Sequence, residues 1–189
     1  MYLPTFTGQQ LNCLDPKPAQ IHPLDIARGL SRAGRFANQA QAFLSVAQHS
    51  LLVADIAEHS LPQPRSGFVL AALLNRAPEA YTGAITSPVA DALNLLAPGV
   101  LRSLQGRLRG AVDRRFGLDL DVAEQVLINV AEREAEVCAR QDLGHDTSGH
   151  WPHLHGVPRP RWVPCVMPMG ADDAMRAFMA RLLALWGDL

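Results

Sequence analysis

Residues 73–88 form the most informative group of polar side chains in this chain. An apolar segment ends there at Asn75 and Arg76, and Glu79 follows three residues after Arg76. A guanidinium stays protonated at any working pH, cannot ligate a metal ion, and repels a dication at close range. It can pair with a carboxylate, or it can fork onto the oxygens of a phosphate group. The residue types leave both roles open for Arg76.

Five of the seven histidines bear on a possible site: one lies on an apolar segment and four lie between residues 141 and 170. His49 lies in an apolar stretch, where a histidine is most often a core residue with a satisfied hydrogen bond, and a binding role also stays open. His145 and Asp146 are adjacent, but no apolar helical segment precedes them, so we expect no metal site there. The other histidines of that region are His150, His153 and His155. No cysteine motif supports a zinc site among them, so we interpret them as surface residues.

Composition indicates a soluble globular protein. The chain has 189 residues, enough for one domain with a substantial core, and 48% are hydrophobic while 19% are charged. The net charge of −1 gives no sign of a nucleic-acid or membrane partner, and no apolar run approaches the roughly 20 residues needed to span a bilayer. Three widely spaced cysteines predict free thiols in a reducing compartment. With no sign of a signal peptide, we expect a cytoplasmic protein.

The spacing of apolar residues predicts an all-α bundle of about seven helices. The predicted helices are 23–34, 41–60, 66–76, 86–96, 100–116, one from Asp119 or Asp121 to Arg140, and 171–186. Segment 66–76 is apolar nearly all round, which indicates a central buried helix. Residues 1–21 read as an ordered arm and 141–170 as mostly loop, and no segment alternates for long enough to predict a strand. We therefore predict a single domain over residues 1–189.

A basic cluster lies on the predicted helix 100–116, opposite its leucines. Its members are Arg102, Arg107, Arg109, Arg114 and Arg115. Most such clusters are solvated helix faces, and the neutral total charge does not favour nucleic-acid binding. We expect a solvated face here, and we interpret the three tryptophans of the chain as packing residues.

Several short motifs occur in a fixed order along almost the whole chain. They are Asp25-Ile26-Ala27, Arg35-Phe36, Ser45-Val46-Ala47-Gln48-His49-Ser50, Pro78-Glu79-Ala80-Tyr81-Thr82-Gly83 and Met167-Pro168. With these motifs the chain resembles the HD-domain phosphohydrolases, most closely the small bacterial branch related to 5′-deoxynucleotidases. The resemblance implies a single HD-domain helical bundle and places a divalent metal ion at the centre of the family's chemistry.

The resemblance implies four metal-ligand positions, but only one keeps the family's residue type. His49 matches the first ligand, Asn75 and Arg76 replace the His-Asp pair that names the family, and Glu132 stands where a shorter aspartate is expected. Imidazole and carboxylate groups suit a transition metal, whereas an amide is a poor ligand and a guanidinium is none. We therefore expect no metal cofactor and no phosphohydrolase activity.

The resemblance also implies a ligand pocket. Arg35 and Phe36 match a basic–aromatic pair that contacts the phosphate and the base or sugar of a substrate, and Glu79 matches a residue that helps to activate water or protonate the leaving group. In a metal-free protein we expect Glu79 to be non-functional. The pocket that the resemblance implies is edged by Arg35, Phe36, His49, Arg76 and Glu79.

The favoured hypothesis is a degenerate HD-domain protein, a pseudoenzyme that binds a nucleotide or another phosphorylated small molecule in a regulatory or scaffold role. By resemblance we also expect a homodimer. The alternative is an active, 5′-deoxynucleotidase-like phosphohydrolase with a rearranged site. That reading requires His49, Glu79 and Glu132 to recruit manganese, cobalt or iron despite the charge of Arg76.

Overall fold

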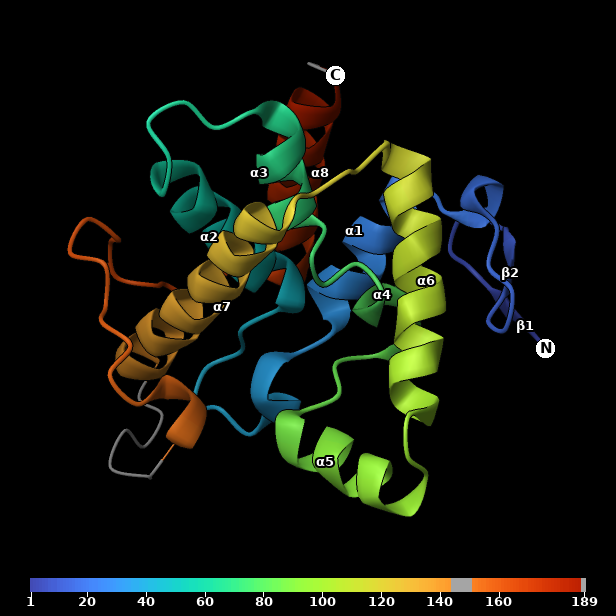
Figure 1. Ribbon diagram of the computed structural model, residues 1–189, viewed down its shortest axis with the longest axis horizontal. Helices are drawn as coiled ribbons and strands as arrows, with labels where there is room; N and C mark the ends of the chain where they lie inside the picture. The colour runs from blue at the N-terminus through green and yellow to red at the C-terminus, as the bar shows by residue number, and fades with distance from the viewer. Residues whose placement is uncertain (144–150, 188–189) are drawn as a thin grey trace.

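The computed structural model describes residues 1–143 and 151–187. Within these residues the chain forms eight α-helices and one small β-hairpin, so the predicted all-α class is confirmed (Figure 1). The helices are α1 (Pro23–Arg32), α2 (Val46–His59), α3 (Ser66–Leu73), α4 (Glu79–Thr82), α5 (Ser87–Leu96), α6 (Val100–Phe116), α7 (Val122–Asp142) and α8 (Ala171–Gly187). Three single 3₁₀ turns lie at Pro18–Gln20, Arg35–Asn38 and Pro152–Leu154.

All seven predicted helices are present, with corrections at two boundaries and one addition. Helix α2 begins at Val46 rather than near residue 41, because Ser45 is extended and its side chain caps the helix by accepting from the Gln48 amide at 3.0 Å. Helix α3 ends at Leu73, before the turns that lead to Pro78. The added helix, α4, has only four residues, too few to produce a helical period in the sequence.

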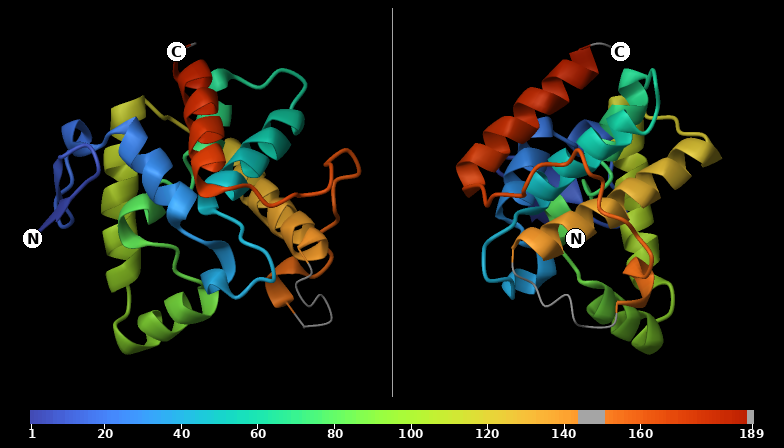
Figure 2. Two further views of the ribbon diagram at one scale, coloured as in Figure 1. Left: turned by 180° about the vertical axis from the view of Figure 1, so that it is seen from behind. Right: turned by 90° about the vertical axis from the view of Figure 1, so that its left-hand side faces the viewer.

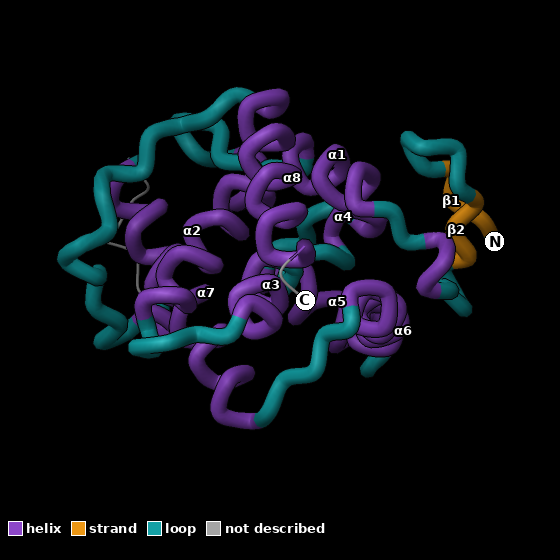
Figure 3. Tube along the Cα trace, turned by 90° about the horizontal axis from the view of Figure 1, so that it is seen from above, coloured by secondary structure: helices purple, strands orange, loops and turns teal. Residues whose placement is uncertain are grey.

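The N-terminal arm contains the hairpin, which the sequence did not predict. Strand β1 (Tyr2–Pro4) pairs antiparallel with β2 (Gln10–Asn12), and three residues in each strand are too few to show a period of two. Figure 3 shows the hairpin at the periphery, set apart from the packed helices. Leu11 buries its side chain completely, and the Asp25 carboxylate accepts from the Thr7 amide at 2.8 Å and hydroxyl at 2.7 Å. These contacts hold the arm on the bundle.

Helices α1, α2, α3, α7 and α8 pack around one apolar core, and α8 crosses α1 on the back of the molecule (Figure 2). Every residue of α3 after Ser66 is buried, as predicted for a central helix. Among the described helices, none combines the length and apolarity that crossing a membrane would require. The core positions α2, α7 and the junction between α3 and α4, which together carry the candidate site.

The predicted solvated face of α6 is confirmed in part: Arg102, Arg107 and Arg114 are exposed, whereas Arg109 and Arg115 are half-buried. Arg107 donates to the Leu14 carbonyl at 2.8 Å, and Arg115 donates to the Ile21 carbonyl at 3.1 Å. Both contacts tie α6 to the N-terminal arm, whose conformation the sequence pattern of α6 does not encode. The tryptophans pack as expected: Trp186 lies edge-on to Phe116, Trp162 stacks on His59, and Trp151 covers Arg140.

Candidate functional site

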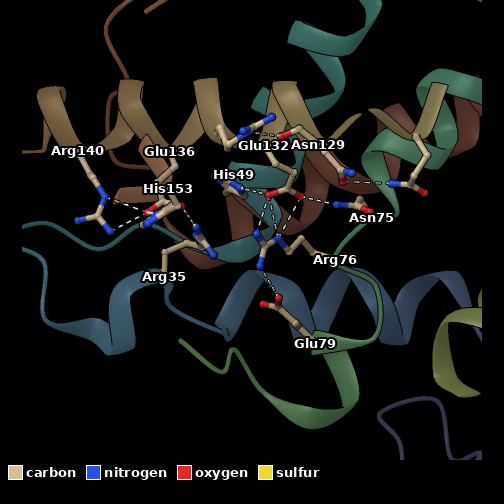
Figure 4. Close-up of polar contacts among 12 residues, drawn as sticks. Arg35, His49, Asn75, Arg76, Glu79, Asn129, Glu132, Glu136, Arg140 and His153 are labelled. Carbon is tan, nitrogen blue, oxygen red and sulfur yellow. Dashed lines mark hydrogen bonds and ion pairs between the residues drawn. The ribbon is translucent and has the colours of Figure 1, made fainter. Parts of the chain in front are cut away.

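Three segments bring the predicted metal-ligand positions together on one side of the core (Figure 4). His49 comes from the first turn of α2, Glu132 from the middle of α7, and Asn75 and Arg76 from the turns that follow α3. Glu79 opens α4, one turn beyond Arg76. We call these five residues the Glu132 cluster. The family resemblance singled out these five residues, and the structure places them together and shows how they pair.

Glu132 accepts hydrogen bonds from three side chains on two other segments. Asn75 Nδ2 lies 2.7 Å from Oε1, and His49 Nε2 lies 3.0 Å from Oε2. Arg76 reaches both oxygens, with Nε at 3.0–3.1 Å and Nη2 at 2.7 Å. Burial disfavours the charged carboxylate, but the His49 hydrogen bond and the Arg76 guanidinium hold the pKa of Glu132 well below its ordinary value. Glu132 is therefore an anion whose two oxygens are both occupied by donors.

Arg76 bridges two carboxylates. Its Nη1 donates to Glu79 Oε1 at 2.8 Å while its other nitrogens hold Glu132. Burial alone would lower the pKa of Arg76, but the two glutamates raise it above its ordinary value. The Arg76 cation thus lies where a metal ion would have to contact His49 and Glu132. Among the described residues, no three His, Cys, Asp or Glu side chains are arranged to hold a metal. The donor set does not fit a divalent cation.

His49 is a buried neutral imidazole. Its side chain is 1% exposed, and burial together with the nearby Arg35 charge lowers its pKa to about 4 despite the contact with Glu132. With the proton on Nε2, His49 donates to Glu132. Within residues 1–143 and 151–187, Nδ1 meets no hydrogen-bond partner. A proton on Nδ1 would therefore be a buried donor without an acceptor, which explains why the neutral form is favoured.

Arg109 orients Asn75 from α6. Its Nη2 donates to Asn75 Oδ1 at 3.1 Å, and its Nη1 donates to the Leu74 carbonyl at 3.2 Å. Because the amide oxygen accepts from Arg109, the amide nitrogen points at Glu132. Arg109 was predicted to lie on a solvated face, and its contact with Asn75 was not predicted. The two residues meet only because the fold sets this part of α6 beside the turn that follows α3.

A cleft of about 360 Å³ opens beside the Glu132 cluster and shares Arg76 with it. We call it the anion cleft. Its lining residues are Arg35, Phe36, Ala37, Gln39, Arg76, Ile85, Thr86, Ser87, Pro88, Glu136, Arg140, Trp151 and His153. Among these described residues there are three guanidinium groups and a single carboxylate, Glu136. The first turn of α5 also borders the cleft, and a helix N-terminus favours anions.

Arg35 is a buried cation with few hydrogen-bond acceptors around its guanidinium group. Its side chain is 11% exposed, and its Nη2 lies 3.5 Å from Glu136 Oε2, at the limit of a hydrogen bond. Nothing in the described part of the chain accepts from Arg35 Nε, which is buried. Burial and the charge of Arg76 lower the pKa of Arg35. An anion in the cleft would supply the missing acceptor and offset the repulsion between the two guanidinium groups.

Two aromatic rings of the cleft lining flank Arg140. The Phe36 ring centre lies 4.7 Å and the Trp151 ring centre 3.9 Å from the Arg140 guanidinium carbon. Glu136 accepts from Arg140 at 2.7 Å and contacts His153 at 3.3 Å. The cleft therefore combines aromatic surface with its charged groups.

The segment that carries Phe36 is strained. Phe36, Ala37 and Asn38 all have positive φ angles, of 56°, 54° and 60°. Non-glycine residues rarely adopt this region, and such strain concentrates at functional sites. After bends at residues 40–42 the chain returns, and Ser45 forms an antiparallel bridge with Gly34. The strained turn places the Phe36 ring over Arg35 and Arg140, with the Arg35 guanidinium carbon 5.3 Å from its centre.

The anion cleft includes residues that the sequence analysis did not select. Glu136 and Arg140 follow Glu132 by one and two turns of α7, so helical spacing from Glu132 was the signal that could have found them. His153, predicted to be a surface residue, contacts Glu136 and remains 45% exposed. His145, Asp146 and His150 lie outside the described residues.

The fold and site define an all-helical protein in which a buried arginine–glutamate cluster borders a cationic cleft. No protein-family model matches the chain. It is 30% identical over 180 residues to the uncharacterized protein YfdR of Escherichia coli K12, a match covering 95% of this chain and 93% of YfdR. It is also 40% identical over 114 residues to an uncharacterized protein of Rhodobacter capsulatus, covering 59% of this chain and 56% of that protein's length. The chain belongs to the YfdR family.

Proposed function

We propose that this chain is a degenerate relative of the HD-domain phosphohydrolases that binds a phosphorylated small molecule, such as a nucleotide, without a metal ion and without hydrolysing it. The observation that carries the proposal is the position of Arg76. Its guanidinium pairs with Glu132 and Glu79, and the same side chain lines the anion cleft. The Arg76 cation thus takes the place of the metal ion's charge, and it also lines the cleft in which the ligand would bind.

Hydrolysis is disfavoured because the oxygens of Glu132 that would bind a metal ion are already occupied. A metal-dependent phosphohydrolase needs an ion that polarises a phosphoryl oxygen and acidifies a bound water. Here both oxygens of Glu132 already accept from Arg76, Asn75 and His49. A guanidinium has no open coordination position and no acidic water to offer. The chain's own side chains can hold a phosphate but do not supply an activated nucleophile.

Binding of a phosphorylated ligand is supported by the residues that line the anion cleft. Arg35 offers a buried donor without an acceptor in the described part of the chain, and Arg76 and Arg140 add positive charge on either side of it. Guanidinium groups match the geometry of phosphate oxygens. Phe36 and Trp151 add aromatic surface to the lining of the same cleft. A nucleotide offers a phosphate to the guanidinium groups and a base to the aromatic rings, and we place its binding in a regulatory or scaffold role in the cytoplasm.

Calorimetric titration without metal tests the binding. We expect inorganic phosphate and nucleoside 5′-monophosphates to bind in the presence of a chelator, with the nucleotides binding more tightly because the aromatic wall contributes. Arg35→Ala should weaken binding by at least about tenfold, equivalent to about 1.4 kcal/mol. Arg102→Ala, which removes an exposed arginine outside the cleft, should leave the affinity unchanged. Equal affinities for all three proteins would refute the cleft as the binding site.

Metal analysis tests the loss of hydrolysis. Purified protein grown with added manganese, cobalt and iron should carry none of them in stoichiometric amount, and it should release no phosphate from a panel of deoxynucleotides. The double variant Asn75→His and Arg76→Asp removes the cation and adds an imidazole and a carboxylate, so it should gain transition-metal binding. A stoichiometric metal in the wild-type protein, with phosphate release, would establish the active phosphohydrolase instead.

A further inference from the structure

Glu136 is a carboxylate that lines the anion cleft and joins its cationic side chains (Figure 4). Its Oε1 accepts from Arg140 Nε at 2.9 Å and Nη2 at 2.7 Å, and it lies 3.3 Å from His153 Nε2. Its Oε2 lies 3.5 Å from Arg35 Nη2. Burial favours the protonated carboxyl group, but the hydrogen bond from Arg140 and the charge of Arg35 hold the pKa of Glu136 below its ordinary value. The cleft therefore already contains one fixed negative charge.

Arg76, another guanidinium of the cleft lining, has its charge offset from behind. Its Nη2 lies 2.7 Å from Glu132 and its Nη1 lies 2.8 Å from Glu79, and neither glutamate lines the cleft. The described side chains that line or directly back the cleft thus carry three guanidinium charges and three carboxylate charges. Arg109 lies 3.9 Å from Asp113, so that pair adds no net charge. The cleft is lined by cations, but its surroundings carry no net positive charge.

The charge of a bound phosphate group decides how well it suits these surroundings. A phosphate monoester carries about two negative charges above its second pKa of about 6, whereas a phosphodiester carries one. Repulsion by the Glu136 carboxylate is proportional to the charge of the ligand, so a dianion is repelled twice as strongly. Water screens this repulsion weakly, because the Glu136 side chain is only 14% exposed and that of Arg35 only 11%. The cleft therefore disfavours a second negative charge.

The hydrogen-bond donors left for a ligand also suit a single charge. Arg76 and Arg140 each already donate to a glutamate at 2.7 Å. Arg35 has only the long contact with Glu136, and its Nε is buried without an acceptor in the described part of the chain. One weakly paired guanidinium balances one negative charge on a ligand.

We propose that the anion cleft takes a phosphodiester, whose phosphate carries one negative charge, in preference to a phosphate monoester, and that Glu136 imposes this choice. The preference rests on the proposed binding function and narrows the class of ligand within it. A nucleotide in phosphodiester linkage sets its single charge at Arg35 and still offers a base to Phe36 and Trp151, which line the same cleft. Monoesters bind the same cleft more weakly, because Glu136 repels their second charge.

Two ligands that differ by one charge test the preference: adenosine 5′-monophosphate and its methyl ester, in which a methyl group esterifies one phosphate oxygen. Calorimetric titration with a chelator at about pH 8 keeps the monophosphate a dianion. We expect the methyl ester to bind the wild-type protein at least about tenfold more tightly, and Glu136→Gln to reduce that ratio to about one. The methyl group is the same for both proteins, so the change in the ratio reports the charge of Glu136.

Glu134→Gln is the matched control. It makes the same change of charge on α7, about 200° round the helix axis from Glu136 and outside the cleft lining, so it should leave the ratio unchanged. Glu136→Asp keeps the charge on a shorter side chain and should keep the preference for the methyl ester. The comparison of the two ligands on the wild-type protein needs no variant, so the preference stays testable if Glu136→Gln folds poorly.

The outcomes separate this preference from the binding function on which it rests. A wild-type protein that binds the monophosphate as tightly as its methyl ester would overturn the preference and leave the binding function standing. A ratio that Glu136→Gln does not lower, or that Glu136→Asp abolishes, would overturn the role of the Glu136 charge. Binding of neither ligand would refute the proposed function itself, and the preference with it.

Discussion

Replacing Arg76 by methionine asks whether one buried cation holds the Glu132 cluster together. The substitution removes the donors that reach both oxygens of Glu132 and one oxygen of Glu79, and it keeps a long apolar stem. Both carboxylates are about one-tenth exposed, whereas the Arg76 side chain is 26% exposed. Removing one partner of a buried ion pair costs about 3–5 kcal/mol. Because Arg76 retains some solvent contact, we expect the lower end, about 3 kcal/mol of unfolding free energy at neutral pH.

Urea unfolding followed by circular dichroism measures this loss. The matched control is Arg65→Met, which removes a half-exposed arginine paired with Glu124 and should cost no more than about 1 kcal/mol. The double variant Arg76→Met with Glu132→Gln should be more stable than the sum of the two single losses predicts, because the second change removes the stranded charge.

The pH dependence gives a second readout. In the wild-type protein the pKa of Glu132 lies below its unfolded value of 4.5, so the stability it contributes is present above pH 4.5 and is lost as the pH falls through the folded pKa. Without Arg76, burial favours protonation of the same carboxyl group. The difference between wild type and Arg76→Met should therefore shrink as the pH falls toward 4. A loss no larger than that of the Arg65 control, or a gap that does not change with pH, would refute the reasoning.

Two further predictions concern the elements around the cluster. His49 has a folded pKa of about 4 against 6.5 unfolded, so wild-type stability should fall by about 3 kcal/mol as the pH drops through that window. His49→Gln should remove that part of the dependence in urea midpoints measured at several pH values, and an unchanged slope would contradict the buried neutral imidazole. Gly29→Ala places a Cβ 2.5–2.8 Å from backbone and Cβ atoms of Ala80, so α1 and α4 must separate at a cost of about 1–3 kcal/mol. Gly106→Ala meets none of the described atoms within 4 Å and should be neutral or stabilising, so an equal loss in both variants would reject the contact.

The sequence alone determined the features that depend on local chemistry. Asp121 caps α7 through the Glu124 amide at 2.8 Å, and Pro23 opens α1, because caps and prolines act within one turn. The burial of α3 followed from its apolar circumference. The unsuitability of Arg76 as a metal ligand followed from its residue type alone, since a guanidinium has no lone pair to donate.

Tertiary structure decided everything that depends on which elements meet. Arg109 stands on a face that was predicted to be solvated, yet it orients Asn75 because the fold sets α6 beside the turn that follows α3. Arg35 lacks a strong acceptor only because α7 places Glu136 at 3.5 Å. Val89, Leu93 and Leu96 share one face of α5 and are exposed, because the polar face of the helix lines the cleft against α6. Sequence periodicity reports that a helix has two faces, and long-range packing decides which of them is buried.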